Sequence, residues 1–180
     1  MFPEVVEVFA PSEFLVKPAR HAWERDEALG LRRAVFCIEQ RLFHGSDLDE
    51  IDARATTLVA AACVAGIPDQ VVGTVRIHTT APGVWWGSRL AVHPSFRSNG
   101  QIGSTLIRLA VGMAVLQGCT SFLAHVQWQN VALFEKLHWT LLEKVELHGR
   151  EHGLMRAELD FYPGEARFLD GIVTRVRARP

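Results

Sequence analysis

The sequence predicts one mixed α/β (α+β) domain, and three observations lead to this class. Hydrophobic residues make up 48% and charged residues 22% of the 180 residues, which is typical of a globular chain with a sizeable core. Strand-like apolar runs and helix-like apolar spacings succeed one another along the chain. A strand-like run also leads through a glycine-containing turn into a helix at residues 85–118. We therefore expect one domain over residues 1–180, with flexible or extended tails at about residues 1–11 and 165–180.

The first half of the chain predicts a strand, a helix and a hairpin. EFLVKPA at residues 13–19 is strand-like, and residues 23–42 have the spacing of one helix or two short ones. The acidic segment FHGSDLDEIDAR at residues 43–54 predicts a loop. TTLVAAACVAG and QVVGTVRIHTT are β-rich and are separated by IPDQ, where we place the hairpin turn.

The second half predicts a further strand, two helices, and three more strands. WWGSRLAVHP is a strand closed by Pro94, and the helix that follows ends at Gly118. The remaining segments are, in order, a strand at residues 121–127, a short helix at 130–139, and two strands within 141–159 joined by a glycine-containing turn. No internal repeat is visible.

Charge and cysteine content exclude several classes of function. Nineteen basic against 20 acidic side chains give a net charge of −1, which disfavours binding of nucleic acid or a membrane surface. The three cysteines are widely spaced in apolar contexts, which favours reduced, buried thiols. MFPEVVEVFA lacks the basic and apolar regions of a signal peptide, and no later stretch reaches membrane-spanning length. We expect a cytoplasmic protein.

The turn before the helix at residues 103–118 is a candidate anion site. Gly100 and Gly103 permit close approach of a ligand to the backbone, and the free N–H groups of a first helical turn attract anionic oxygens. The alternative is structural, with Gly100 in a simple turn and Ser104 as a helix cap.

The stretch RLAVHPSFRSNGQIGSTLIRLAVG resembles the GNAT superfamily of acyl-CoA-dependent N-acyltransferases, and the likeness covers most of the chain. In that family the loop reads Arg/Gln-x-x-Gly-x-Gly/Ala and holds the pyrophosphate of coenzyme A. Arg97 and Gly100 match the first two anchors, whereas Ile102 stands at the third and Gly103 follows one residue late.

Other motifs are similar to narrower groups within the superfamily. LRRAVFCIEQ, Asp49, Asp52, VVGTVRI, SRLAV and GREHGLM resemble the ElaA-type branch. The R-x-x-V-F-x-x-E-Q part is shared with acyl-homoserine-lactone synthases, but the later G-x-x-H-x-x-M favours an amine acetyltransferase. WWGSRLAV, FLAHVQ and LFEKLHW resemble the GNAT proteins encoded beside nitrilases in bacterial nitrogen-starvation gene clusters.

The resemblance implies a GNAT fold, in which a mixed, mostly antiparallel sheet is flanked by helices and splayed between its fourth and fifth strands. It implies acetyl-CoA as co-substrate, no metal, and direct transfer to a small amine in a ternary complex. The residues it assigns to coenzyme A are Leu90, Ala91 and Val92 in the strand, Arg97, Gly100, Gln101, Ile102, Gly103 and Ser104 in the loop and helix start, and Asn130 and Phe134 after the fifth strand.

Phe134 stands where many GNAT enzymes have the tyrosine that protonates the departing thiolate. The single tyrosine of the chain, Tyr162, lies beyond the last predicted strand and is a poor substitute by local sequence. The unperturbed thiol pKa is about 8.5, so thiolate leaves readily near neutral pH, and the missing hydroxyl does not exclude catalysis.

Three titratable residues are candidates for the catalytic base: Glu39, His125 and His152. Each has a structural alternative. Glu39 could be a solvated helix-end carboxylate, and His125 a hydrogen-bonded core histidine. His152 and His148 have a spacing that would suit a metal, but the neighbouring glycines favour a turn and no third ligand is evident.

Arg76 and Arg89 lie in otherwise apolar strands, where an unpaired guanidinium is costly. They indicate either an anionic ligand or internal salt bridges to Asp49, Asp52 or Glu39, and the sequence leaves both open. Trp85 and Trp86 must point to opposite faces of a strand, so one of them, which we take as Trp86, could line the acceptor pocket together with the arginines.

The leading interpretation is an N-acetyltransferase acting on a small amine that carries a carboxylate or similar anionic group. A homodimer is compatible with it. A non-catalytic acyl-CoA-binding or partner-docking module is the first alternative, favoured by the missing tyrosine and the altered loop. An acyl-homoserine-lactone-type synthase is the second.

Overall fold

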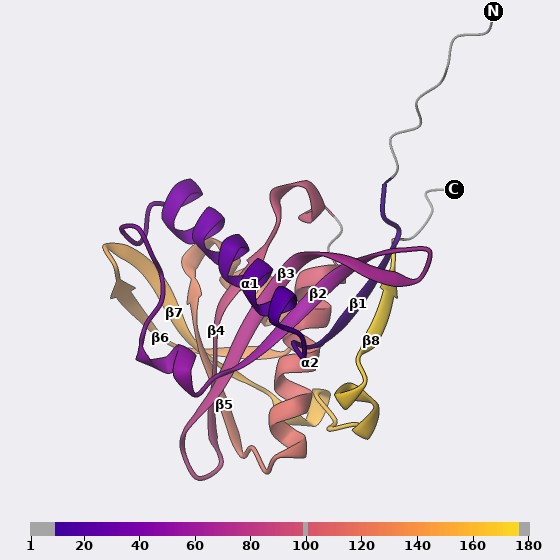
Figure 1. Cartoon of the computed structure of the whole chain (residues 1–180). Helices are drawn as coiled ribbons and strands as arrows, with labels where there is room; N and C mark the ends of the chain where they lie inside the picture. Colours follow the sequence, from indigo (N-terminus) through magenta and orange to yellow (C-terminus); the bar gives the residue numbers. More distant parts are fainter. Residues whose placement is uncertain (1–9, 99–100, 177–180) are drawn as a thin grey trace, which may run out of the picture.

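One eight-stranded sheet, with strand order β6-β7-β5-β4-β3-β2-β1-β8, organises the part of the chain that the computed structural model describes, residues 10–98 and 101–176 (Figure 1). The strands are β1 (Glu13–Pro18), β2 (Thr56–Val64), β3 (Ile67–Ala81), β4 (Val84–Val92), β5 (Ser121–Gln127), β6 (Trp139–Leu147), β7 (Arg150–Ala157) and β8 (Ile172–Arg175). The α-helices are α1 (Ala22–Arg32), α2 (Gln101–Leu116) and α3 (Val131–Lys136), and the short helical turns are η1 (Arg33–Glu39), η2 (Glu50–Ala53), η3 (Pro94–Phe96), η4 (Trp128–Asn130), η5 (Leu159–Phe161) and η6 (Ala166–Leu169).

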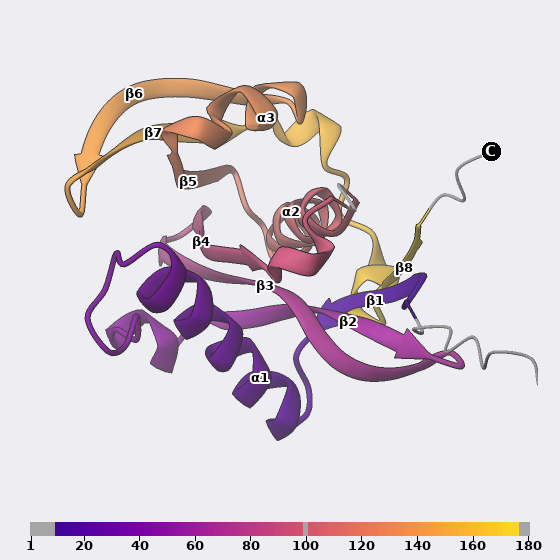
Figure 2. The same ribbon diagram turned by 90° about the horizontal axis from the view of Figure 1, so that it is seen from above.

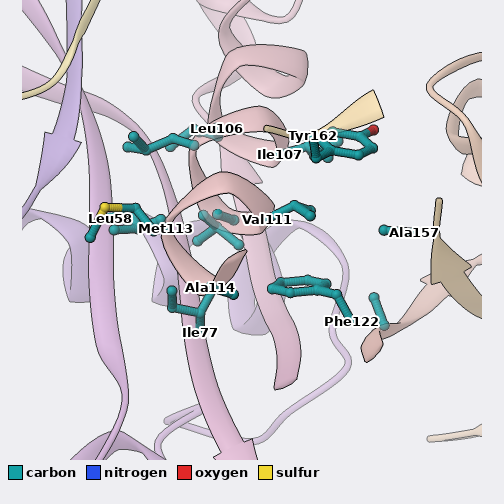
Figure 3. Packing of buried hydrophobic residues seen from close by; sticks show 14 of the residues in the cluster. Leu58, Ile77, Leu106, Ile107, Val111, Met113, Ala114, Phe122, Ala157 and Tyr162 are labelled. Carbon is teal, nitrogen blue, oxygen red and sulfur yellow. The ribbon is translucent and has the colours of Figure 1, made fainter. Parts of the chain in front are cut away.

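Helices cover both faces of the sheet. Figure 2 shows α1 on one face of β1–β4 and α2 on the other, between that part of the sheet and β5–β7. The core gathers around α2, where Val111 lies among Leu58, Ile77 and Phe122 from three strands (Figure 3). Burial on both faces explains why β3 is continuously buried from Val71 to His78. No helix in the described residues has the length and apolarity needed to cross a membrane.

The order of elements agrees with the sequence, but the first hairpin turns earlier than expected. Ala65 and Gly66 have φ values of 51° and 78°, as a two-residue turn with left-handed backbone requires, and IPDQ belongs to β3. The prediction of a turn at IPDQ was therefore wrong. Pro68 and Asp69 are typical turn residues, but here they lie at the end of the β2–β3 ladder. The register is irregular there, so the strand accommodates them.

The C-terminal segment contains structure for which the sequence pattern gave no signal. β8 pairs antiparallel with β1 and extends the sheet at its edge. Phe168, in η6, is fully buried, and its ring lies so near Gly112 of α2 that a Cβ built there would stand 2.2 Å from Cε2.

The predicted splay between the fourth and fifth strands is confirmed. β4 and β5 are the parallel pair of the sheet, and their register covers Val84–Ser121, Trp85–Phe122 and Trp86–Leu123. Beyond Trp86, β4 has no strand partner on that side among the described residues.

A β-bulge distorts β4 at the same place. Thr74 of β3 pairs with Ala91 and Arg76 pairs with Ser88, so one residue of β3 faces two of β4, Arg89 and Leu90. Arg89 has φ 56°, a left-handed conformation that is unusual for a residue with a side chain. Bulges and strained backbone of this kind cluster beside functional sites.

Candidate active site

A cavity of about 650 Å³ lies where β4 and β5 separate. Side chains from η1, the acidic loop, β3, β4, α2, β5, α3 and the β6–β7 turn line it. The predicted site residues in its wall are Arg76, Trp86, Arg89, Leu90, His125, Asn130, Phe134 and His152. Of the other predicted residues, Glu39, Ala91, Val92, Arg97, Gln101, Ile102, Gly103 and Ser104 lie outside the lining, and Gly100 falls outside the described residues.

Backbone groups of β4 face the opened side of the sheet. His93 N–H donates to Val72 O of β3 at 2.8 Å, whereas Val92 O accepts from Arg97 Nε at 2.9 Å. Because alternate residues of a strand direct their backbone groups to opposite edges, the N–H and C=O groups of Leu90 also face β5. Ala91 faces β3 instead, and its side chain packs against α1 and η1. Leu90 and Val92 are thus the residues whose backbone a ligand in the splay could pair with.

At the start of α2, backbone N–H groups rather than side chains are available to bind a ligand. Ile102 is buried in the core, and Gln101 Oε1 accepts a hydrogen bond from Thr174 Oγ1 at 2.9 Å. Ser104 Oγ donates to the carbonyl of Gln101 at 3.3 Å. A Cβ at Gly103 would meet only Val92 Cγ2, at 3.9 Å. The first N–H groups of an α-helix lack intrahelical acceptors, so this end of α2 can receive an anion.

Glu39 pairs with Arg97, a partner that the sequence did not suggest. Arg97 Nη1 and Nη2 donate to the two carboxylate oxygens at 2.6 and 2.7 Å. The hydrogen bond from Arg97 lowers the pKa of Glu39 below its usual range. A carboxylate held in this way is a weaker proton acceptor, and it stands outside the cavity wall.

Arg76 is saturated by partners within the chain. Its Nη1 and Nη2 donate to Asp49 at 2.6 and 2.8 Å, Nη1 also lies 2.8 Å from Asp52 Oδ2, and Nε donates to Ser88 Oγ at 2.9 Å. The residue is only 2% exposed. The structure therefore has the salt bridge that the sequence left open as one of two possibilities, with two of the three partners named there.

Arg89 and Arg32 complete the network. Arg89 Nε lies 3.0 Å from Asp47 Oδ2, Nη2 lies 3.2 Å from Asp49 Oδ2, and the guanidinium covers the ring of Phe43 at 4.5 Å. Arg32, buried in α1, donates to Asp47 and also to Asp52, at 2.8 and 2.6 Å. Three arginines thus neutralise three aspartates. Arg32 and Asp47 were missed, although an arginine at an apolar helix position was a signal for a buried partner.

Two of the predicted histidines meet at the cavity. The ring of His125 lies against Trp86, with centroids 5.1 Å apart. Partial desolvation, and then the nearby His152, lower the pKa of His125 below its ordinary value. His152 is 6% exposed, and its Nδ1 is 3.0 Å from Arg150 O. Because a carbonyl only accepts, Nδ1 of His152 donates this hydrogen bond.

A third histidine, His78 of β3, also lines the cavity and was missed in the sequence. It is 7% exposed, and its Nδ1 is the one buried side-chain nitrogen or oxygen atom without a hydrogen-bond partner in the described residues. A buried polar atom without a hydrogen bond typically lowers the stability of the folded protein by about 1–3 kcal/mol. Arg76, His78 and Thr80 recur at every second position and all line the cavity. That alternation was the available signal.

No tyrosine hydroxyl reaches the cavity wall as described. Phe134 lines the cavity and packs edge-on against Trp139. Tyr162 donates to Leu137 O and accepts from Trp139 Nε1 at 3.0 Å, outside the lining. Burial raises the pKa of Tyr162. Among the described residues, no three His, Cys, Asp or Glu side chains gather as metal ligands.

Comparisons with known proteins agree with this architecture. A family model described as the acetyltransferase (GNAT) family matches residues 17–139. A search of curated protein sequences found no match. A candidate N-acetyltransferase from Lactobacillus plantarum is similar in structure, with TM-score 0.71, 21% identity, and coverage of 80% of this chain and 97% of that one.

Two further solved structures are similar. Escherichia coli ElaA gives TM-score 0.66 at 17% identity, covering 81% of this chain and 98% of that one. The acyl-homoserine lactone synthase BjaI, solved with SAM and isopentyl-CoA, gives TM-score 0.66 at 14% identity, covering 87% and 86%. At these identities the likeness shows the fold. With the family model spanning more than half of the chain, this protein belongs to the GNAT family of acetyltransferases.

Proposed function

We propose that the protein transfers an acetyl group from acetyl-CoA to a small amine, directly and in a ternary complex. The observation that carries this proposal is the opened β4–β5 pair, which exposes backbone groups of Leu90 and Val92 beside a cavity lined by histidines. Acyl transfer needs a hydrogen-bond donor that stabilises the developing oxyanion, a proton acceptor, and a place for the thioester. This arrangement offers all three.

We propose that coenzyme A is bound mainly by backbone groups of β4 and of the start of α2. The pantetheine arm pairs with Leu90 and Val92 in place of the missing part of β5, and the pyrophosphate meets the start of α2 beside Gly103. Arg97, which already contacts Val92 O, adds a cation there. The similar BjaI structure holds isopentyl-CoA, which supports a CoA-type ligand in this fold.

The chemical step is an attack of the amine nitrogen on the acyl carbonyl. The N–C bond forms, the C–S bond breaks, and the electron pair leaves with sulfur as a thiolate. Leu90 N–H stabilises the carbonyl oxygen as it gains charge. His125 accepts the proton from nitrogen, because its lowered pKa keeps the imidazole neutral near pH 7. Water in the open cavity protonates the thiolate, since Phe134 has no hydroxyl.

The proposed acceptor is a small amine, and the two arginines expected to bind a carboxylate on it have partners within the chain. That prediction depended on Arg76 and Arg89, and both guanidinium groups are paired with aspartates of the same chain. The likeness to GNAT proteins of nitrilase gene clusters, the cytoplasmic location and the homodimer stay predictions.

A thiol-release assay with acetyl-CoA and a panel of amines tests the proposal. We expect turnover, with His125→Asn lowering kcat by about 100-fold, a typical contribution of general base catalysis. The acid limb of the wild-type pH–kcat/KM profile should lie below about pH 6.5, the ordinary imidazole value, and should disappear in the variant. Acetyl-CoA binding without turnover would favour the non-catalytic module, and turnover only with SAM and a longer acyl-CoA would favour the lactone synthase.

A further inference from the structure

His78 has no structural partner that would account for its place in the sheet. Arg76, two residues away, donates to Asp49, Asp52 and Ser88. Nδ1 of His78 has no hydrogen-bond partner in the described part of the chain, although 93% of the residue is buried. A buried polar group left in this way calls for a ligand or a functional explanation.

The surroundings of His78 are those of a ligand site. In the β3–β4 register it stands directly opposite Trp86, and both residues line the cavity. His125 lies against Trp86. The proposed proton acceptor thus contacts the Trp86 ring, and His78 is the cross-strand neighbour of the same residue. Rotation of the His78 ring about Cβ–Cγ exchanges Nδ1 and Cδ2, so a molecule in the cavity can supply the absent partner.

His78 is neutral near pH 7. Burial lowers its pKa most, the cations of Arg76 and Arg54 lower it further, and Asp49 opposes them only weakly. A neutral imidazole has one N–H donor and one acceptor nitrogen, which suits a hydroxyl or an amide. A carboxylate would find no uncommitted guanidinium at Arg76.

We propose that His78 is a specificity-determining residue that hydrogen-bonds an uncharged hydroxyl or amide group of the acceptor, whose apolar body packs against Trp86. This inference rests on the proposed acetyltransferase function and deepens it. The substrate class is thus a small amine with an aromatic or similarly apolar body and a neutral polar group near the amino nitrogen, in place of an anionic one.

Four amines that share one skeleton test the inference: phenethylamine, phenylalaninol, phenylalaninamide and phenylalanine. With acetyl-CoA, we expect wild-type kcat/KM for the alcohol or the amide to exceed that for phenethylamine by about tenfold or more, because the latter leaves His78 unpartnered. Phenylalanine should gain no advantage from its carboxylate.

His78→Phe should abolish the preference, and His78→Gln, which keeps a polar group, should restore part of it. Comparing ratios between variant and wild type cancels differences in amine basicity. The melting temperature of His78→Phe should equal or exceed that of wild type, since the variant removes an unpartnered buried nitrogen, and acetyl-CoA affinity measured by calorimetry should not change. His44→Phe, exposed and outside the cavity lining, is the matched control.

The outcomes separate the two proposals. Unchanged ratios in His78→Phe, or a large loss of stability in both His78 variants with the preference intact, would overturn the role of His78 alone. Turnover of other amines but none of these four would overturn the substrate class. If wild type neither binds acetyl-CoA nor releases thiol with any amine, the acetyltransferase function itself fails.

Discussion

At the scale of single residues, ion pairs decide which predicted groups are available for chemistry. Glu39 and Arg97 were predicted for different tasks, proton transfer and phosphate binding, and the structure joins them. Their side chains are 39% and 41% exposed, so the pair adds little stability, typically about 0–1 kcal/mol. If Arg97 binds a CoA phosphate as proposed above, that phosphate and Glu39 compete for one guanidinium.

Glu39→Gln should therefore tighten CoA binding severalfold and leave amine turnover intact. The neutral amide holds Arg97 less strongly, and the cation becomes available to phosphate. Calorimetric titration with CoA measures the affinity. Glu13→Gln is the control, since Glu13 forms a comparable surface pair with Arg175. Loss of turnover with normal acetyl-CoA binding would instead restore Glu39 as the catalytic base.

At the scale of elements, α2 has two glycines with opposite reasons for their small size. Gly103, in the first turn, has room for a Cβ, which would make only an ordinary contact with Val92 Cγ2 at 3.9 Å. Gly112 lies about two and a half turns later in the same helix. A Cβ built on Gly112 would stand 2.2 Å from Cε2 of the buried Phe168 ring. Packing against Phe168 explains Gly112, whereas for Gly103 we propose close approach of the CoA pyrophosphate.

Alanine at each position separates these reasons. Gly103→Ala should keep or raise the free energy of unfolding, since alanine favours helix, while weakening CoA binding by about tenfold, equivalent to roughly 1.4 kcal/mol. Gly112→Ala should lower the free energy of unfolding by about 1–3 kcal/mol through overpacking. Urea unfolding and CoA titration of both variants measure the effects. Wild-type CoA affinity in a folded Gly103→Ala protein would contradict the phosphate site.

At the scale of the whole molecule, one network of three arginines and three aspartates connects segments far apart in sequence. Arg32 in α1, the acidic loop, Arg76 in β3 and Arg89 in β4 meet beside the β4 bulge. Burial alone would raise the pKa of Asp52, but hydrogen bonds from Arg32, Asp49 N–H and Arg76 outweigh it and lower the pKa well below its usual range.

Because the pKa of Asp52 is lowered in the folded state, the free energy of unfolding depends on pH in the acidic range. A carboxyl group with a depressed folded-state pKa stabilises the protein above its unfolded value of about 3.9, and that stabilisation is lost as pH falls below it. Asp52→Asn should lower the free energy of unfolding at pH 7 and reduce the further loss between pH 4 and pH 3. Urea unfolding across this range tests it, with exposed Asp69→Asn as control. An unchanged acid loss in Asp52→Asn would contradict the assignment.

Apolar periodicity predicted the order of the elements, and the resemblance of local motifs to the GNAT superfamily implied the position of the splay. Both depend on residues near one another in the chain. The sequence also placed Arg76, Trp86, Arg89, Leu90, His125 and His152 at one site. The turn at Ala65–Gly66 was hidden, since alanine rarely signals a left-handed backbone.

Which of these side chains are available to bind a ligand depends on contacts between segments that are distant in the sequence. The partners of Arg76 and Arg89 come from a loop more than 20 residues away, and no local pattern chooses between an aspartate of the chain and a substrate anion. β8 is four residues long and pairs with β1 from the other end of the chain. His78 became a candidate because its Nδ1 has no hydrogen-bond partner among the described residues. This depends on three-dimensional packing and cannot be read from the sequence of the strand.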